Sequence, residues 1–196
     1  MTRLASKETM HALKERGDDF YASPPEAVRA LLAIEAAFLP RRIWEPACGD
    51  GAIVMPMRAA GFDVHASDLV ARGCPDSEAG VDFLMPFPVP QGIGGVISNP
   101  PFKNAVEFIE KSLLIAPYVA MLLRVSFLEG IARKPWFEAG PLARVHVSSR
   151  RMPMMHRHGW EGEKTGSAIA FAWFVWDARH IGAPEIHWFD WAECGQ

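Results

Sequence analysis

The sequence predicts an α/β fold: a mostly parallel seven-stranded sheet with helices on both faces and an antiparallel final strand. Short apolar runs alternate with segments of helical periodicity, and strands that alternate with helices usually pair in parallel. At 196 residues, 49% of them hydrophobic, the chain is expected to form a single domain, 1–196, with a substantial core. Its net charge of −3 and near-zero mean hydropathy are ordinary for a soluble protein of this class.

Each element follows from its local pattern. Helical periodicity covers Arg3–Arg16, Pro25–Phe38, Ala52–Ala60, Asn104–Ile115 and Leu128–Phe137. Apolar runs of strand length cover Ile43–Pro46, Val64–Ser67, Val81–Leu84, Val96–Ser98, Val119–Val125, Ala143–Ser148 and Ala168–Trp176. The last run, with Glu185–Trp191 behind it, predicts an antiparallel pair that closes one side of the sheet. Residues 1–40 are expected to form an N-terminal helical lid.

The cysteines and apolar runs indicate the compartment. Cys48, Cys74 and Cys194 are far apart and odd in number, so neither a disulfide framework nor a zinc site is expected. The first 19 residues are charged throughout, unlike a signal peptide. The longest apolar run, Leu113–Leu123, contains Pro117 and is too short to span a bilayer. We therefore expect a cytoplasmic protein that does not enter membranes and needs no metal.

The segment Ser98–Phe102 is the most informative one for chemistry. Two prolines end the preceding strand and push Asn99 out of the helical region, so a rigid amide is held at the strand's carboxyl edge. If the Asn99 side-chain oxygen and the Pro100 carbonyl accept hydrogen bonds from a conjugated amine, electron density returns to its nitrogen as a methyl bond forms. Phe102 is expected to stack on the flat substrate.

The segment Glu45–Gly51 predicts a ligand-binding turn between a strand and a helix. Gly49 and Gly51 let the backbone approach a ligand, as in dinucleotide sites. The next strand ends in Asp68, 17 residues after Gly51, and a carboxylate at this place is suited to a ribose diol.

With these motifs in this order, the chain resembles the class I S-adenosylmethionine-dependent methyltransferases. Among them it is most similar to the small phage and bacterial enzymes that methylate adenine N6 in DNA. The resemblance implies a Rossmann-like fold, S-adenosyl-L-methionine as cofactor, and catalytic roles for Asn99, Pro100 and Phe102 in the family's tetrapeptide. Asp19–Pro24 resembles the segment that closes over the cofactor's methionine end, and Val81–Phe83 the segment that reads its adenine. The implied cofactor-binding residues are Tyr21, Ser23, Pro24, Glu45, Ala47, Gly49, Gly51, Asp68, Asp82, Phe83 and Asn99.

Positive charge follows the tetrapeptide. Residues 100–164 hold ten basic and six acidic residues, whereas acidic residues are in excess on both sides. Within this region, 150–165 is a polar stretch between two strands and is the candidate substrate loop. We expect phosphate and base contacts to come from Lys103, Arg150, Arg151, Arg157 and Trp160. This distribution favours a substrate with phosphates; the resemblance implies DNA, with RNA as a further candidate.

The chain departs from the family after the substrate loop. DNA methyltransferases of this motif order usually carry a large C-terminal recognition domain, but only about 30 residues follow Thr165. A separate recognition subunit or a homo-oligomer is therefore an open alternative. Three other functions remain open: an RNA N-methyltransferase, a protein glutamine N5-methyltransferase, and a catalytically idle nucleic-acid-binding domain. The glutamine enzymes are a better match with Tyr at position 102, and the intact motifs disfavour an idle domain.

Overall fold

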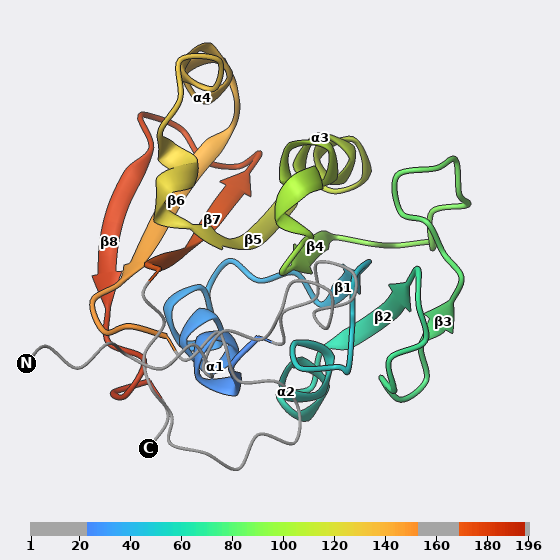
Figure 1. Ribbon diagram of the computed structural model, residues 1–196. Helices are drawn as coiled ribbons and strands as arrows, with labels where there is room; N and C mark the ends of the chain where they lie inside the picture. Colours follow the sequence, from blue (N-terminus) through green and yellow to red (C-terminus); the bar gives the residue numbers. More distant parts are fainter. Residues whose placement is uncertain (1–22, 153–168, 195–196) are drawn as a thin grey trace, which may run out of the picture.

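The computed structural model describes residues 23–152 and 169–194, and these form one eight-stranded sheet between two layers of helices (Figure 1). The strands are β1 Arg42–Glu45, β2 Asp63–Asp68, β3 Glu78–Ala79, β4 Gly95–Ser98, β5 Tyr118–Arg124, β6 Leu142–Ser148, β7 Phe171–Asp177 and β8 Glu185–Phe189. Their spatial order is β3-β2-β1-β4-β5-β7-β6-β8. Neighbouring strands are parallel except at β7, which runs antiparallel to β5 and β6. The predicted α/β fold is confirmed, with the two-residue β3 as an eighth strand.

Helices cover both faces of the sheet, as expected. They are α1 Pro25–Ile34, α2 Val54–Ala59, α3 Ala105–Ile115 and α4 Lys134–Ala139. In Figure 1, α1 and α2 lie on one face, and α3 and α4 lie on the other. Strand β5 is apolar along its length because both of its faces are covered: Ala120 and Leu122 join the core under α1, while Val119, Met121 and Leu123 join the core under α3.

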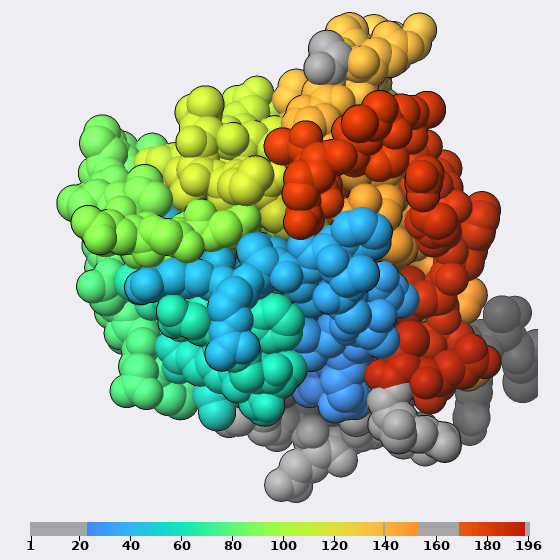
Figure 2. All heavy atoms as spheres, turned by 180° about the vertical axis from the view of Figure 1, so that it is seen from behind, coloured from blue at the N-terminus to red at the C-terminus, as the bar shows by residue number. Residues whose placement is uncertain are grey.

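Seen from behind in Figure 2, the blue residues of α1 lie between the teal residues of α2 and the red C-terminal segment. Two contacts hold this arrangement in place. Trp173 of β7 donates from its indole nitrogen to the carbonyl of Ala27 in α1 at 2.9 Å. Arg179 donates to the carbonyl of Phe38, which follows α1, at 2.7 Å. Helix α1 and the residues after it are therefore held to β7 and to the segment that follows β7.

The prediction of a strand over Val81–Leu84 is wrong. The backbone N–H of Val81 still donates to the carbonyl of Asp68, but the chain then turns. The Asp82 side chain accepts the N–H of Leu84 at 3.0 Å, and its carbonyl accepts the N–H of Met85. An aspartate that binds the backbone two residues ahead favours a turn over a sheet ladder.

The predicted antiparallel pair of Ala168–Trp176 with Glu185–Trp191 is also wrong, although β7 itself is antiparallel. Strand β8 pairs with β6 and runs parallel to it. Both edges of β7 are already occupied, by β5 and by β6, so the last strand adds to the free edge of β6. The loop between β7 and β8 therefore crosses the end of β6.

Helices α1 and α4 depart furthest from their predicted bounds. The helix expected over Leu128–Phe137 is broken at Gly130, whose φ of +122° is not helical, and α4 begins only at Lys134. Helix α1 ends at Ile34. The next residue, Glu35, is no longer helical, and its carboxylate accepts hydrogen bonds from side chains of β6. The predicted helix Arg3–Arg16 and most of the loop 150–165 lie outside the described residues. Among the helices of the described ranges, none is long and apolar enough to cross a membrane.

Candidate active site

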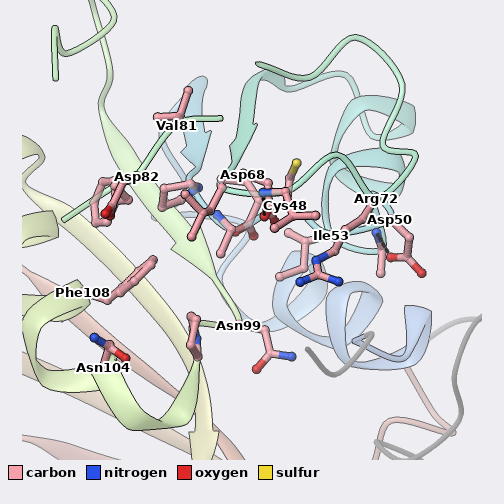
Figure 3. A pocket seen from close by; sticks show the side chains of 18 of the residues that line it. Cys48, Asp50, Ile53, Asp68, Arg72, Val81, Asp82, Asn99, Asn104 and Phe108 are labelled. Carbon is pink, nitrogen blue, oxygen red and sulfur yellow. Dashed lines mark hydrogen bonds between the residues drawn. The ribbon is translucent and has the colours of Figure 1, made fainter. Parts of the chain in front are cut away.

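A cavity of about 270 Å³ lies where β1, β2 and β4 end. Open parallel sheets bind ligands at this carboxyl edge. The loops after the three strands form its walls, and Figure 3 shows Asp68 and Asp82 on one side with Asn99 and Asn104 on the opposite side. The predicted cofactor loop, its carboxylates and the predicted catalytic loop therefore meet at one cavity.

The loop after β1 depends on two glycines with left-handed backbone conformations. Gly49 has a φ of +55° and Gly51 a φ of +90°, which other residues rarely adopt. A Cβ on Gly51 would lie 3.1 Å from Sγ of Cys74, so a side chain there would also be crowded. The N–H of Gly49 donates to Oδ2 of Asp68 at 2.8 Å. Glycine at these positions lets the loop turn tightly against the end of β2.

The two predicted cofactor carboxylates both line the cavity. Asp68 accepts the N–H of Gly49 on one oxygen and that of Val70 on the other, at 2.8 and 2.9 Å. Each carboxylate oxygen has two lone pairs, so Asp68 keeps acceptor capacity for a ligand. Asp82 is exposed and accepts the N–H of Leu84 on Oδ1 alone. Phe83 is 2% exposed, and its ring packs edge-on against Trp44, so little of it faces the cavity.

Glu45 and Ala47 lie at the start of this loop and also line the cavity. The side chain of Glu45 is completely buried, and its Oε1 accepts two hydrogen bonds, from the N–H of Ala47 at 3.1 Å and from the hydroxyl of Ser98 at 2.7 Å. Its Oε2 has no hydrogen-bond partner among the described residues. Burial raises the pKa of Glu45 to about 8. The side chain of Glu45 therefore connects the loop after β1 to the last residue of β4.

Asn99 directly follows β4, and its side chain lines the cavity. Pro101 has a φ of −53° and a ψ of 127°, which keeps the loop extended. The carbonyl of Pro101 accepts the N–H of Asn104 at 3.0 Å, which begins the short 3-10 helix Phe102–Asn104 that leads into α3. The loop is therefore fixed at both ends, and the position of Asn99 is well defined.

Phe102 is placed beside the cavity and not on its wall. Its ring centroid lies 6.0 Å from that of Phe171, and the guanidinium carbon of Arg124 lies 4.3 Å from the centre of the ring. A cation over an aromatic face stabilises that face's orientation. Arg124, the last residue of β5, is a neighbour of the tetrapeptide that the sequence did not single out. Its place at the end of the strand next to β4 was the available signal.

The N-terminal residues of the predicted site are only partly described. Ser23 is buried and lines the cavity, and Pro24 is buried directly before α1 in an extended conformation. Tyr21 lies outside the described residues. The cavity also has lining residues that were not predicted, among them Asp50, Ile53, Arg72 and Asn104. Each follows a strand or lies in the loop that begins there, which is the signal that could have found them.

The predicted substrate cations Lys103, Arg150 and Arg151 are exposed and do not line the cavity. Arg150 forms a two-pronged ion pair with Asp190, with N–O distances of 2.9 and 2.8 Å. Both arginines follow β6, whose carboxyl end lies at the same edge of the sheet as that of β4. Arg157 and Trp160 lie outside the described residues.

No protein-family model and no curated protein matches the sequence. Solved structures match in fold. A Listeria monocytogenes protein provisionally described as a class I S-adenosylmethionine-dependent methyltransferase matches over 96% of this chain and 70% of its own, with a TM-score of 0.60 and 12% identity. The methyltransferase subunit of a type I restriction-modification system from Streptococcus thermophilus matches over 85% of this chain, with a TM-score of 0.58 and 13% identity.

This chain covers 45% of the length of that subunit. A 23S rRNA methyltransferase matches over 80% of this chain and 68% of its own, with a TM-score of 0.52 and 16% identity. The TM-scores of these matches, 0.52 to 0.60, show a shared fold. The chain thus has the Rossmann-like fold of the class I S-adenosylmethionine-dependent methyltransferases.

Proposed function

We propose that this protein transfers a methyl group from S-adenosylmethionine to the exocyclic N6 amine of adenine in DNA. The observation that carries the proposal is the position of Asn99. It follows β4, is held by two prolines, and lines the same cavity as Asp68 and the glycine loop. A methyl donor bound by the loop and a planar amine bound by Asn99 would meet there in a fixed orientation.

The residues around the cavity fit S-adenosylmethionine. This molecule carries a positive sulfonium, a ribose diol and an adenine, and when bound it supplies an electrophilic methyl group. The cavity presents the carboxylates of Asp50, Asp68 and Asp82. Asp68 would accept hydrogen bonds from the ribose hydroxyls, and Asp82 from the adenine amine. The left-handed conformations of Gly49 and Gly51 give the loop the tight turn that places Ala47 and Asp50 on the cavity wall.

Asn99 and Pro100 would act on the target amine. The side-chain oxygen of Asn99 and the carbonyl of Pro100 accept hydrogen bonds from its two N–H groups, which keeps electron density on the nitrogen and stabilises the positive charge that develops there. Phe102, held by Arg124, would stack on the base. A base in a duplex must first leave the stack, at a cost of about a few kcal/mol.

Two observations favour a nucleic acid as the substrate. The segment after the tetrapeptide has an excess of basic residues, which phosphate binding requires. The similar structures include a subunit of a restriction-modification system and an enzyme that acts on 23S rRNA. We take DNA as the first candidate because the tetrapeptide resembles that of the adenine N6 enzymes, and RNA as the second because of the rRNA enzyme. A separate subunit or a second copy of the chain would help to select the target, which the match to a subunit of a restriction-modification system supports.

The test is transfer of a radiolabelled methyl group to three polymers offered separately: DNA that lacks adenine methylation, total RNA, and protein. Labelled nucleosides or residues are then identified by chromatography. We expect N6-methyladenine in DNA, and no label with Asn99→Ala. Label only in RNA or only in glutamine would contradict the proposed substrate, and no label in any polymer would contradict the proposed activity.

A further inference from the structure

One buried side-chain hydrogen bond joins the two loops that meet at the cavity. The hydroxyl of Ser98 donates to Oε1 of Glu45 at 2.7 Å, across 53 residues of sequence. Both side chains are 0% exposed. A hydroxyl that is buried without a partner costs about 1–3 kcal/mol, so the bond is strongly favoured once both groups are excluded from water.

The acceptor atom is shared between the two loops. Oε1 of Glu45 also accepts the N–H of Ala47, the second residue after β1. A movement of Ala47 therefore changes the position of the oxygen that Ser98 binds. Ser98 in turn directly precedes Asn99, and a hydrogen bond from the N–H of Asn104 to the carbonyl of Pro101 holds the far side of that loop. Asn99 thus lies one residue away from a contact that the other loop controls.

A second buried serine shows that a buried hydroxyl does not need a partner in a separate segment of the chain. Ser112 in α3 is also 0% exposed, and its hydroxyl donates to the carbonyl of Phe108 one turn earlier in the same helix at 2.6 Å. Its hydrogen bond is satisfied locally and connects no separate segments. The hydroxyl of Ser98 instead donates to the acid at the end of the neighbouring strand β1.

We propose that Ser98 is a positioning residue that couples ligand binding at the Glu45–Gly51 loop to the placement of Asn99. The inference rests on the proposed function of that loop and of Asn99. A cofactor that fixes the backbone at Ala47 also fixes the shared oxygen of Glu45, and through Ser98 it fixes the start of the catalytic loop. Because coupling between two sites is reciprocal, substrate bound at Asn99 strengthens cofactor binding by the same factor.

The experiment compares Ser98→Ala with Ser112→Ala, which removes the same hydroxyl from an equally buried site. The dissociation constant of a short adenine-containing DNA is measured with and without saturating S-adenosylhomocysteine. We expect wild type and Ser112→Ala to bind DNA about fivefold more tightly with the cofactor product, within the usual range of coupling. In Ser98→Ala this ratio should fall to about one, and the single-turnover rate of methylation should fall about tenfold.

Equal ratios in Ser98→Ala and Ser112→Ala would overturn the coupling, and so would a ratio of one in wild type. A wild type that binds and methylates RNA in place of DNA contradicts the proposed substrate, and the same comparison is then made with RNA. Calorimetry with S-adenosylhomocysteine needs no polymer: wild type that does not bind it refutes the proposed cofactor, independently of any effect of Ser98.

Discussion

Two glutamates at opposite edges of the same sheet are both completely buried, but their hydrogen-bond partners differ. Glu35 follows α1 and lies near the amino ends of β5 and β6, whereas Glu45 ends β1 beside the cavity. Arg144 donates to both oxygens of Glu35 at 2.7 and 3.0 Å, with His146 at 2.6 Å and the hydroxyl of Tyr118 at 3.1 Å. Glu45 receives only one hydroxyl and one backbone N–H.

These surroundings move the two pKa values in opposite directions. Burial would raise the pKa of Glu35, but hydrogen bonds from His146 and Arg144 outweigh it and hold the pKa below its ordinary value. Burial dominates at Glu45 and raises its pKa to about 8. The edge at Glu35 is therefore a neutralised ion cluster that holds α1 to the sheet. The comparison teaches that a buried carboxyl group marks a candidate site when no cationic partner offsets the cost of its burial, as at Glu45.

The largest expected effect comes from the same substitution at both positions. Glu35→Gln removes the charge that faces Arg144, which is 7% exposed, and should lower the free energy of unfolding by about 3–5 kcal/mol. Glu45→Gln, which resembles the protonated acid, should cost much less. Urea denaturation of both variants at neutral pH checks this. Equal losses at the two sites would remove the distinction between them.

The pH dependence of stability sharpens the same contrast. The pKa of Glu45 rises from 4.5 in the unfolded chain to about 8 in the folded protein. Its contribution to stability is therefore complete below pH 4.5 and is lost as the pH rises toward 8, by at most about 1.4 kcal/mol per pH unit. Glu45→Gln has no such proton to lose, so it should become progressively more stable relative to wild type across this window. A difference in unfolding free energy between Glu45→Gln and wild type that is the same at every pH would show that folding does not change the pKa of Glu45.

Asp68→Ala tests a third carboxylate, at the cavity edge. Removing it should weaken S-adenosylmethionine binding by about 1.5–3 kcal/mol, because charged acceptors for the ribose hydroxyls are lost. Asp82→Ala should weaken binding less, since Asp82 would meet only the adenine amine. Calorimetry gives both values. An affinity unchanged by Asp68→Ala would exclude this residue from the cofactor site.

The smallest expected effects come from two arginine–aromatic pairs, one at each of these two edges of the sheet. Arg124 lies 4.3 Å from the ring centre of Phe102, and Arg144 lies 4.2 Å from that of Phe38. Phe102→Ala should raise the free-energy barrier to methyl transfer by about 1–3 kcal/mol, because stacking on the base is lost. Phe102→Tyr keeps an aromatic ring and should be tolerated. Phe38→Ala, at the structural edge, should leave the rate of transfer unchanged. Equal kinetic losses from the two alanine variants would show that Phe102 acts only through stability.

Much of the fold could be predicted because its signals are local. The apolar runs and proline turns located β1, β2, β4, β5, β6 and β7, and the carboxyl ends of parallel strands brought Asp68 and Asn99 to one edge. The prediction of a strand failed where a side-chain hydrogen bond to the backbone outweighs the apolar pattern. Val81–Leu84 has the apolar content of a strand, but Asp82 binds the backbone of Leu84 and turns the chain.

Contacts between distant residues could not be predicted from the pattern. Glu35 and Arg144 are 109 residues apart, and Glu45 and Ser98 are 53 apart. Nothing in either local sequence distinguishes the acid with four donors from the acid with two. The cation over Phe102 likewise depends on β5 lying beside β4, a neighbour relation that the order of strands in the chain allows but does not require.

The most direct test of the central claim is expression in cells that lack adenine methylation, followed by nucleoside analysis of their DNA and RNA. We expect N6-methyladenine in genomic DNA with the wild-type protein and none with Asn99→Ala, because the amine acceptor is lost. The Asn99→Ala protein should still bind S-adenosylmethionine with near wild-type affinity. A methyl mark found only in RNA or protein would contradict the substrate, and near-normal methylation by Asn99→Ala would contradict the mechanism.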